Sequence, residues 1–192
     1  MLATIPDSAT ARAAADLARE AAPPFLLNHS YRTYLFGAAL VTKDVDQEAA
    51  FVAAMIHDLG LTERHRGSVD FGQVGTALAA RFLERRGWER DRIRLAEKAI
   101  LRHTRLLPEG NPTTRLVQLG ARVDVAGRGA KKIDSDVLTG ILRAYPRLDF
   151  PHQMRTAFLD EARRQPNGSF ARLERIVKLS TRFTANPIDR TA

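Results

Sequence analysis

The sequence contains no cysteine, and this absence removes several kinds of chemistry at once. Without thiols the chain has no disulfides, no thiolate metal ligands and no cysteine nucleophile. Long hydrophobic runs are also missing, since the longest, Ala49–Ile56, is far shorter than the roughly 20 residues that span a bilayer. Residues 1–22 carry acids and arginines and lack the apolar core of a signal peptide. We therefore expect a cytoplasmic protein with no membrane partner.

Acidic residues are fewer than basic ones, 22 against 30, which gives a net charge of +8. A basic surface suits an anionic partner, either nucleic acid or a small molecule. The basic residues are spread along the chain and are mostly arginine, as expected for arginines that coat helices. A small-molecule substrate is therefore expected rather than nucleic acid, and a homo-oligomer stays open.

Alternation with a period of two is absent, and apolar residues recur at helical spacing throughout. The pattern predicts an all-α fold of about nine helices in a single domain, residues 1–183. Its core is expected at 23–127 and its C-terminal helices at 134–183, followed by a loose tail at 184–192. The expected helices are Ala9–Ala22, Phe25–Lys43, Gln47–Leu59, Phe71–Arg86, Glu89–Thr104, Thr113–Ala126, Asp134–Ala144, His152–Arg164 and Phe170–Phe183, with Asp7 or Ser8, Asp46 and Asp70 as caps of the first, third and fourth.

The central feature is the end of the third helix, where an apolar run stops at His57 and Asp58. An adjacent imidazole and carboxylate at the mouth of a core form part of a metal-ligand set. Two other helices offer further ligands on apolar faces, His29 on the second and Asp124 on the sixth.

A carboxylate between two valines, as in Asp124, is expected to be buried and needs a partner. A metal ion, Arg32 or Arg122 could each serve. His103, on the fifth helix, is expected to point into the same core.

The order His…His-Asp…Asp on successive helices resembles the HD superfamily of metal-dependent hydrolases. Three segments resemble its cyanamide hydratase branch more closely: Asn28–Arg32, Met55–Leu61 and Ala99–Thr104. The resemblance covers roughly residues 23–127. It implies that His29, His57, Asp58 and Asp124 hold one divalent metal, and that His103 faces substrate or metal-bound water.

The chain departs from the family pattern at two points. Dinuclear relatives carry further histidines after the His-Asp pair, and Phe71–Ala77 has none, which favours one ion over two. A second ion would have to recruit His103 and the loop residue His65, as in a dinuclear oxygenase. At Gly72 the branch usually has a glutamate, so the match to a cyanamide pocket is incomplete there.

A mixed nitrogen and oxygen set suits Zn or Fe, and also Mn, Ni or Co. Such an ion activates water, and the predicted function is addition of metal-bound hydroxide to a nitrile-like or C–N substrate. Asp58 or His103 would move the proton. Arg32 either contacts the substrate or pairs with Asp124.

Two alternatives remain. One is a metal-dependent phosphohydrolase acting on a nucleotide or other phosphate ester. The other is an inactive basic binding module, suggested by the arginines of the fourth and fifth helices: Arg81, Arg85, Arg86, Arg90, Arg92 and Arg94. The C-terminal helices have three possible roles, which are to complete the core, to cover the pocket or to form a dimer interface.

Overall fold

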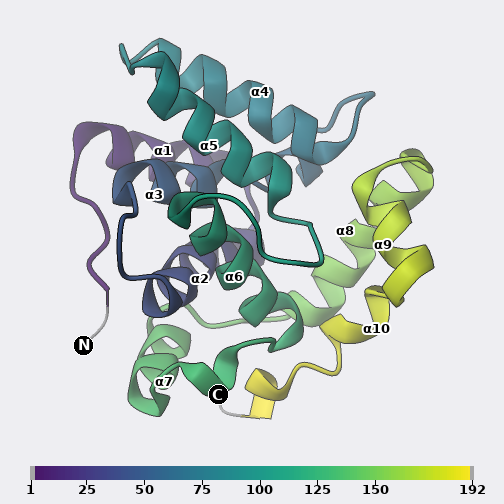
Figure 1. Ribbon diagram of the computed structural model, residues 1–192. Helices are drawn as coiled ribbons and strands as arrows, with labels where there is room; N and C mark the ends of the chain where they lie inside the picture. The colour runs from purple at the N-terminus through teal and green to yellow at the C-terminus, as the bar shows by residue number, and fades with distance from the viewer. Residues whose placement is uncertain (1–2, 191–192) are drawn as a thin grey trace.

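The structure is a computed structural model that describes residues 3–190, and every regular element in that range is a helix (Figure 1). The predicted all-α class is confirmed. The α-helices are α1 (Ala9–Ala21), α2 (Pro24–Leu40), α3 (Gln47–Ile56), α4 (Phe71–Glu84), α5 (Arg90–Arg102), α6 (Pro112–Ala126), α7 (Ser135–Ala144), α8 (Phe150–Arg164), α9 (Ser169–Val177) and α10 (Ser180–Phe183). Three 3₁₀ turns complete the set: η1 (Leu59–Leu61), η2 (Ala130–Lys132) and η3 (Pro187–Arg190). None of the described helices is long and apolar enough to cross a membrane.

Local side-chain chemistry sets the helix starts. The side chains of Ser8, Asp46 and Asp70 accept hydrogen bonds from backbone N–H groups in the first turns of α1, α3 and α4. Each satisfies a donor that has no partner within the helix. Of the two caps considered for α1, Ser8 is the one used.

Five predicted helices end one to three residues early, and one is divided. The expected helix Phe170–Phe183 is divided because Lys178 adopts a left-handed conformation, φ 47°, which ends α9 before α10 begins. A lysine gives no sequence signal for this break, which glycine would have given. The described residues therefore contain ten α-helices rather than nine. The third helix ends at Ile56, so His57 and Asp58 lie at the junction between α3 and η1.

The helices enclose two adjoining groups of buried side chains. The larger is built mainly by α1–α7 and the smaller joins α8–α10 to α2 and α4. The smaller group is rich in phenylalanine, including Phe71, Phe150, Phe158, Phe170 and Phe183. Figure 1 shows α4 and α5 side by side at the top, with α8, α9 and α10 together on the right beside α6. The C-terminal helices thus complete the core, whereas the single-domain boundaries stay a prediction.

Helices α2 and α6 approach so closely that their backbones touch. A Cβ atom at Gly120 would lie 1.7 Å from the Thr33 carbonyl oxygen, and one at Gly37 would lie 2.2 Å from that of Leu116. Only glycine fits at either position. This contact brings the polar residues of α2 within hydrogen-bond distance of Asp124 on α6.

Residues 184–190 of the expected tail, 184–192, pack against the rest of the chain, and residues 191–192 lie outside the described range. Asn186 and Ile188 are buried, and the Asn186 amide donates to the backbone carbonyls of Val123 and Asp124, the latter at 2.7 Å. Asp189 pairs with Arg147 at 2.5 Å. The segment packs against the end of α6 because it satisfies polar groups there.

Candidate metal centre

Three donor atoms from two parts of the chain converge on one point in the core. His57 Nε2 lies 3.2 Å from His29 Nε2, and each nitrogen lies 3.3 Å from Asp58 Oδ2. Their residues are 0%, 1% and 2% exposed, respectively. We call these three atoms the ligand triangle. Donors 2.0–2.1 Å from a tetrahedral ion lie about 3.3 Å apart, so the triangle has the size of one face of a coordination shell.

The hydrogen bonds behind the two histidines fix which ring nitrogen carries the hydrogen. His57 Nδ1 lies 2.8 Å from the Ala54 carbonyl, and His29 Nδ1 lies 2.6 Å from Asp124 Oδ2. Both oxygens accept only, so each Nδ1 donates and each neutral ring presents an Nε2 lone pair. The triangle then consists of three acceptors with no hydrogen between them. A cation at their centre removes this conflict.

Burial and neighbouring charges act on the protonation of the triangle. Burial lowers the pKa of His57, which favours the neutral ring that a metal requires. Burial also opposes the charge on Asp58, yet the surrounding histidines hold the pKa of its carboxyl well below the usual value. Burial opposes protonation of His29, but its hydrogen bonds to Asp124 and Asp58 outweigh this and raise the pKa of His29. The two carboxylates beside His29 therefore favour positive charge at the triangle.

Among the described residues, Asp58 is left without a permanent positive partner. Arg32 and Arg147 together balance Asp124 and Asp189, with both guanidinium groups bonded to Asp124 and that of Arg147 also to Asp189. Asp58 Oδ1 is buried with no hydrogen-bond partner in the described chain. A buried, ionised carboxylate without a partner is costly, and a divalent ion supplies what is missing. The residues therefore fit a metal.

Asp124, expected as a fourth ligand, lies outside the ligand triangle. One of its oxygens contacts Nδ1 of His29, the ring nitrogen that does not face the triangle. Arg32 binds both oxygens through Nε and Nη2, each at 2.8 Å. Burial would raise the pKa of Asp124, but Arg32, His29 and Arg147 hold it far below its usual value. In this arrangement Asp124 fixes the ring orientation and tautomer of His29, the usual task of a residue behind a metal ligand.

Arg32 was expected either to contact substrate or to pair with Asp124, and its contacts are those of the pair. It is fully buried, and its Nη1 donates to the backbone carbonyls of Tyr145 and Pro146, both at 3.0 Å. Arg122, the other arginine considered for Asp124, lines the pocket instead.

Sequence reasoning missed Arg147, whose Nη1 lies 2.5 Å from Asp124 Oδ1. It follows α7 in an irregular loop, where no periodic pattern marks a residue as buried. Arg147 also packs over the Phe150 ring, 4.7 Å from its centroid. No feature of the sequence marks Arg147 as part of the site.

His103 lies at the end of α5, on the pocket side of the triangle. Its Nδ1 donates to the Ile100 carbonyl at 2.5 Å, so its Nε2 is an acceptor 3.4 Å from Asp58 Oδ1. Its ring packs edge-on against Phe71. His65 belongs neither to the triangle nor to the residues that line the pocket.

A cavity of about 90 Å³ lies over the triangle. His29, Asp58 and His103 are its most polar buried lining residues and form its floor. Its walls are apolar side chains from α6, from α8–α10 and from the junction of α9 and α10: Ala121, Val125, Met154, Phe170, Leu173, Val177, Leu179 and Phe183. The C-terminal helices therefore cover the pocket, one of the roles considered for them.

A set of lone-pair donors at the floor of an apolar pocket, enclosed by helices, is the arrangement of a helical metal-dependent enzyme. The chain belongs to the HD domain family, whose model matches residues 26–134. The matched region begins in α2 and reaches just beyond η2, so it contains all the residues of the triangle as well as His103 and Asp124. Membership makes the chain a metal-dependent hydrolase or hydratase.

Two curated proteins of Saccharomyces cerevisiae are similar to this chain, cyanamide hydratase DDI2 and cyanamide hydratase DDI3. Each is 27% identical over 173 residues, which cover 85% of this chain and 77% of the yeast protein. The similarity extends well beyond the HD domain match, and the resemblance to the cyanamide hydratase branch is confirmed.

Proposed function

We propose that this chain is a single-metal enzyme that adds water to a small nitrile-like or C–N substrate. One observation carries the proposal: the ligand triangle presents two lone-pair nitrogens and an unpaired carboxylate at the floor of a pocket. The similarity to two cyanamide hydratases supports the carbon electrophile. Zn or Fe is the expected ion, and Mn, Ni or Co also suits the donors.

His29, His57 and Asp58 would hold the ion. When bound, a divalent ion lowers the pKa of a coordinated water from about 15.7 to roughly 7 and so supplies a nucleophile at neutral pH.

His103 is suited to accept and return a proton. Its Nδ1 is occupied by the Ile100 carbonyl, so its Nε2 lone pair faces Asp58 Oδ1 and the pocket. A nitrile nitrogen must gain a proton as water adds to the carbon, and a positioned imidazole can deliver it. The Ile100 carbonyl orients the ring, and Asp58 Oδ1, 3.4 Å from Nε2, would accept the hydrogen once Nε2 is protonated. Asp124 and Arg32 would act indirectly, since Asp124 orients the His29 ring and Arg32 positions Asp124.

Phosphate-ester hydrolysis is the second candidate, and one observation favours it. Arg122, Arg128 and Arg182 line the pocket, and no described carboxylate lies within 4.0 Å of their nitrogens. The binding-module alternative has less support, because Arg90, Arg92 and Arg94 are ion-paired on the protein surface. Intramolecular pairing leaves less free charge for nucleic acid.

The first test is metal content, measured by elemental analysis of freshly purified protein. About one transition metal per chain, lost in His57→Ala and Asp58→Asn, is expected. Lys98→Ala, which alters an exposed side chain of α5, is the control that should keep the ion. A native protein that stays metal-free after incubation with Zn, Fe, Mn and Ni would overturn the proposal.

The second test is turnover by the metal-loaded protein. Cyanamide, acetonitrile and related small nitriles are incubated with it, and the urea or amide product is followed by NMR. A parallel panel of nucleotides is assayed for phosphate release. Phosphate release without any hydration would transfer support to the second candidate, and neither activity would remove both substrate claims while leaving the metal site.

A further inference from the structure

The pocket is larger than cyanamide requires, and most of its lining is apolar, whereas cyanamide is small and polar. Its polar floor occupies one end, and apolar side chains from α6 and α8–α10 form most of its wall. A molecule of three heavy atoms would contact the floor and leave the wall unused. Apolar wall surface that contacts a ligand contributes about 25 cal/mol per Å² removed from water, so the lining favours a ligand with an apolar body.

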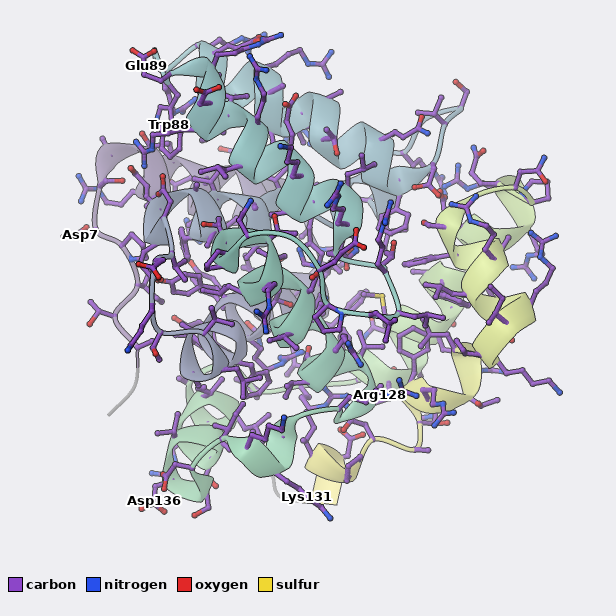
Figure 2. The ribbon with its side chains drawn as sticks, viewed as in Figure 1. Asp7, Trp88, Glu89, Arg128, Lys131 and Asp136 are labelled. Carbon is purple, nitrogen blue, oxygen red and sulfur yellow. The ribbon has the colours of Figure 1, made fainter. Side chains whose placement is uncertain are left out.

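Three arginines stand at the outer end of this pocket. Arg128 and Arg182 are exposed and Arg122 is half-buried, whereas the histidines of the floor are buried. Figure 2 labels Arg128, which follows the C-terminal end of α6, a helix in contact with α10, where Arg182 lies. This burial gradient runs from the floor to the mouth. Their exposure places these three arginines toward the open side of the pocket, whereas the floor residues are buried.

The charges at the mouth lack partners, in contrast to other arginines nearby. Arg105 also lines the pocket but pairs with Glu109 at 2.6 Å. Arg122, Arg128 and Arg182 make no side-chain hydrogen bond or ion pair within residues 3–190. Burial and the nearby charge of Arg128 lower the pKa of Arg122, so the two guanidinium groups repel each other. An anion between them would remove this repulsion.

From this arrangement we propose that the pocket binds an organic anion whose apolar body lies against α8–α10 and whose anionic group is held at the mouth by Arg122, Arg128 and Arg182. The anionic group is a carboxylate or a phosphate, and it serves for recognition, because the reacting group lies at the triangle. The inference rests on the proposed function in taking this cavity as the substrate pocket. It makes the natural substrate larger than cyanamide.

Binding to the metal-loaded full chain, measured by isothermal calorimetry, tests the inference without turnover. Hexanoate and hexyl phosphate carry both features, hexanamide has the body without the charge, and acetate and inorganic phosphate have the charge without the body. We expect at least one six-carbon anion to bind about tenfold or more tighter than hexanamide and than its short counterpart. Preference for hexanoate or for hexyl phosphate identifies the anionic group.

The matched variants are Arg122→Gln/Arg128→Gln and the control Arg85→Gln/Arg143→Gln, which removes the same charge from exposed positions outside the pocket. The first should weaken binding of the six-carbon anion about tenfold or more and leave hexanamide unchanged, and the control should change neither. Thermal unfolding verifies that both variants fold.

The inference would be overturned if hexanamide bound as tightly as the six-carbon anions. It would also be overturned if the two double variants weakened binding of the six-carbon anion equally. Hydration of cyanamide by the same preparation would then leave the proposed function standing. Anion binding without any turnover would support this inference and count against the proposed function. The two failures are therefore distinguishable.

Discussion

Replacing Arg147 with methionine should destabilise the protein far more than its position in a loop suggests. Arg147 is 5% exposed, and its Nη1 lies within hydrogen-bond distance of both the side chain and the backbone carbonyl of Asp124. Methionine keeps much of the apolar length and removes the charge. The variant therefore reports on the ion pair more than on packing.

The size of the effect follows from what remains around Asp124. Removing one partner of a buried ion pair costs about 3–5 kcal/mol, because the other charge stays buried. Asp124 keeps both hydrogen bonds from Arg32, so we expect the lower end, about 3 kcal/mol. For a chain of this size, that corresponds to a fall in the melting temperature of roughly 6–12 °C.

The assay is thermal unfolding followed by circular dichroism, with Arg163→Met as the control. Arg163 forms an i,i+3 pair with Asp160 on the surface, and its side chain is 75% exposed. Loss of such a pair costs about 0–1 kcal/mol. If the free energies of unfolding of Arg147→Met and Arg163→Met differ by less than about 0.5 kcal/mol, the buried Arg147–Asp124 pair does not stabilise the fold.

Three further outcomes are expected. Asp124→Asn should keep the metal but bind it about 10–100-fold more weakly, as measured by competition with a chelator, whereas complete loss would make Asp124 a direct ligand. Gly120→Ala should lower the free energy of unfolding, measured by chemical denaturation, by about 3 kcal/mol or more, because its Cβ would overlap the Thr33 carbonyl. The control is Gly67→Ala, whose Cβ would lie 3.4 Å from the nearest non-neighbouring atom, and it should change stability by less than about 0.5 kcal/mol. The bond from Arg92, opposed by burial, lowers the pKa of Asp46, so this carboxylate stabilises the fold above its unfolded-state pKa of about 4. The stability difference between wild type and Asp46→Asn, followed by urea unfolding, should be constant above about pH 5 and shrink as the pH falls below 4; a difference independent of pH would contradict the assignment.

Much of the fold is predictable because its determinants are local. Capping by Asp46 and Asp70 and the apolar periodicity of each helix act within a few residues, and most boundaries follow within one to three positions. Lys178 is the instructive exception. Its left-handed conformation separates α9 from α10, both of which pack against α8, and lysine at that point is no signal for such a break.

The site is predictable in its components and less so in its geometry. The types and order of His29, His57 and Asp58 are sufficient to anticipate a ligand set. Which nitrogen of His29 meets Asp124 depends on how closely α2 and α6 pack, and that distance is fixed by Gly37 and Gly120. Tertiary contacts of this kind have no signature in helical spacing.

The burial of Asn186 has a consequence for the order in which the site is assembled. Synthesis is vectorial, and the histidines of α2 and α3 leave the ribosome long before the residue that closes the end of α6. A nascent chain can thus fold its helical core before two interactions form. These are the hydrogen bond from the Asn186 amide to the Asp124 carbonyl and the ion pair of Arg147 with Asp189. During that interval His29 is held by an incomplete support. The support of His29 is therefore complete only once residues 186–189, which follow Asp124 by more than sixty positions, have packed against the end of α6.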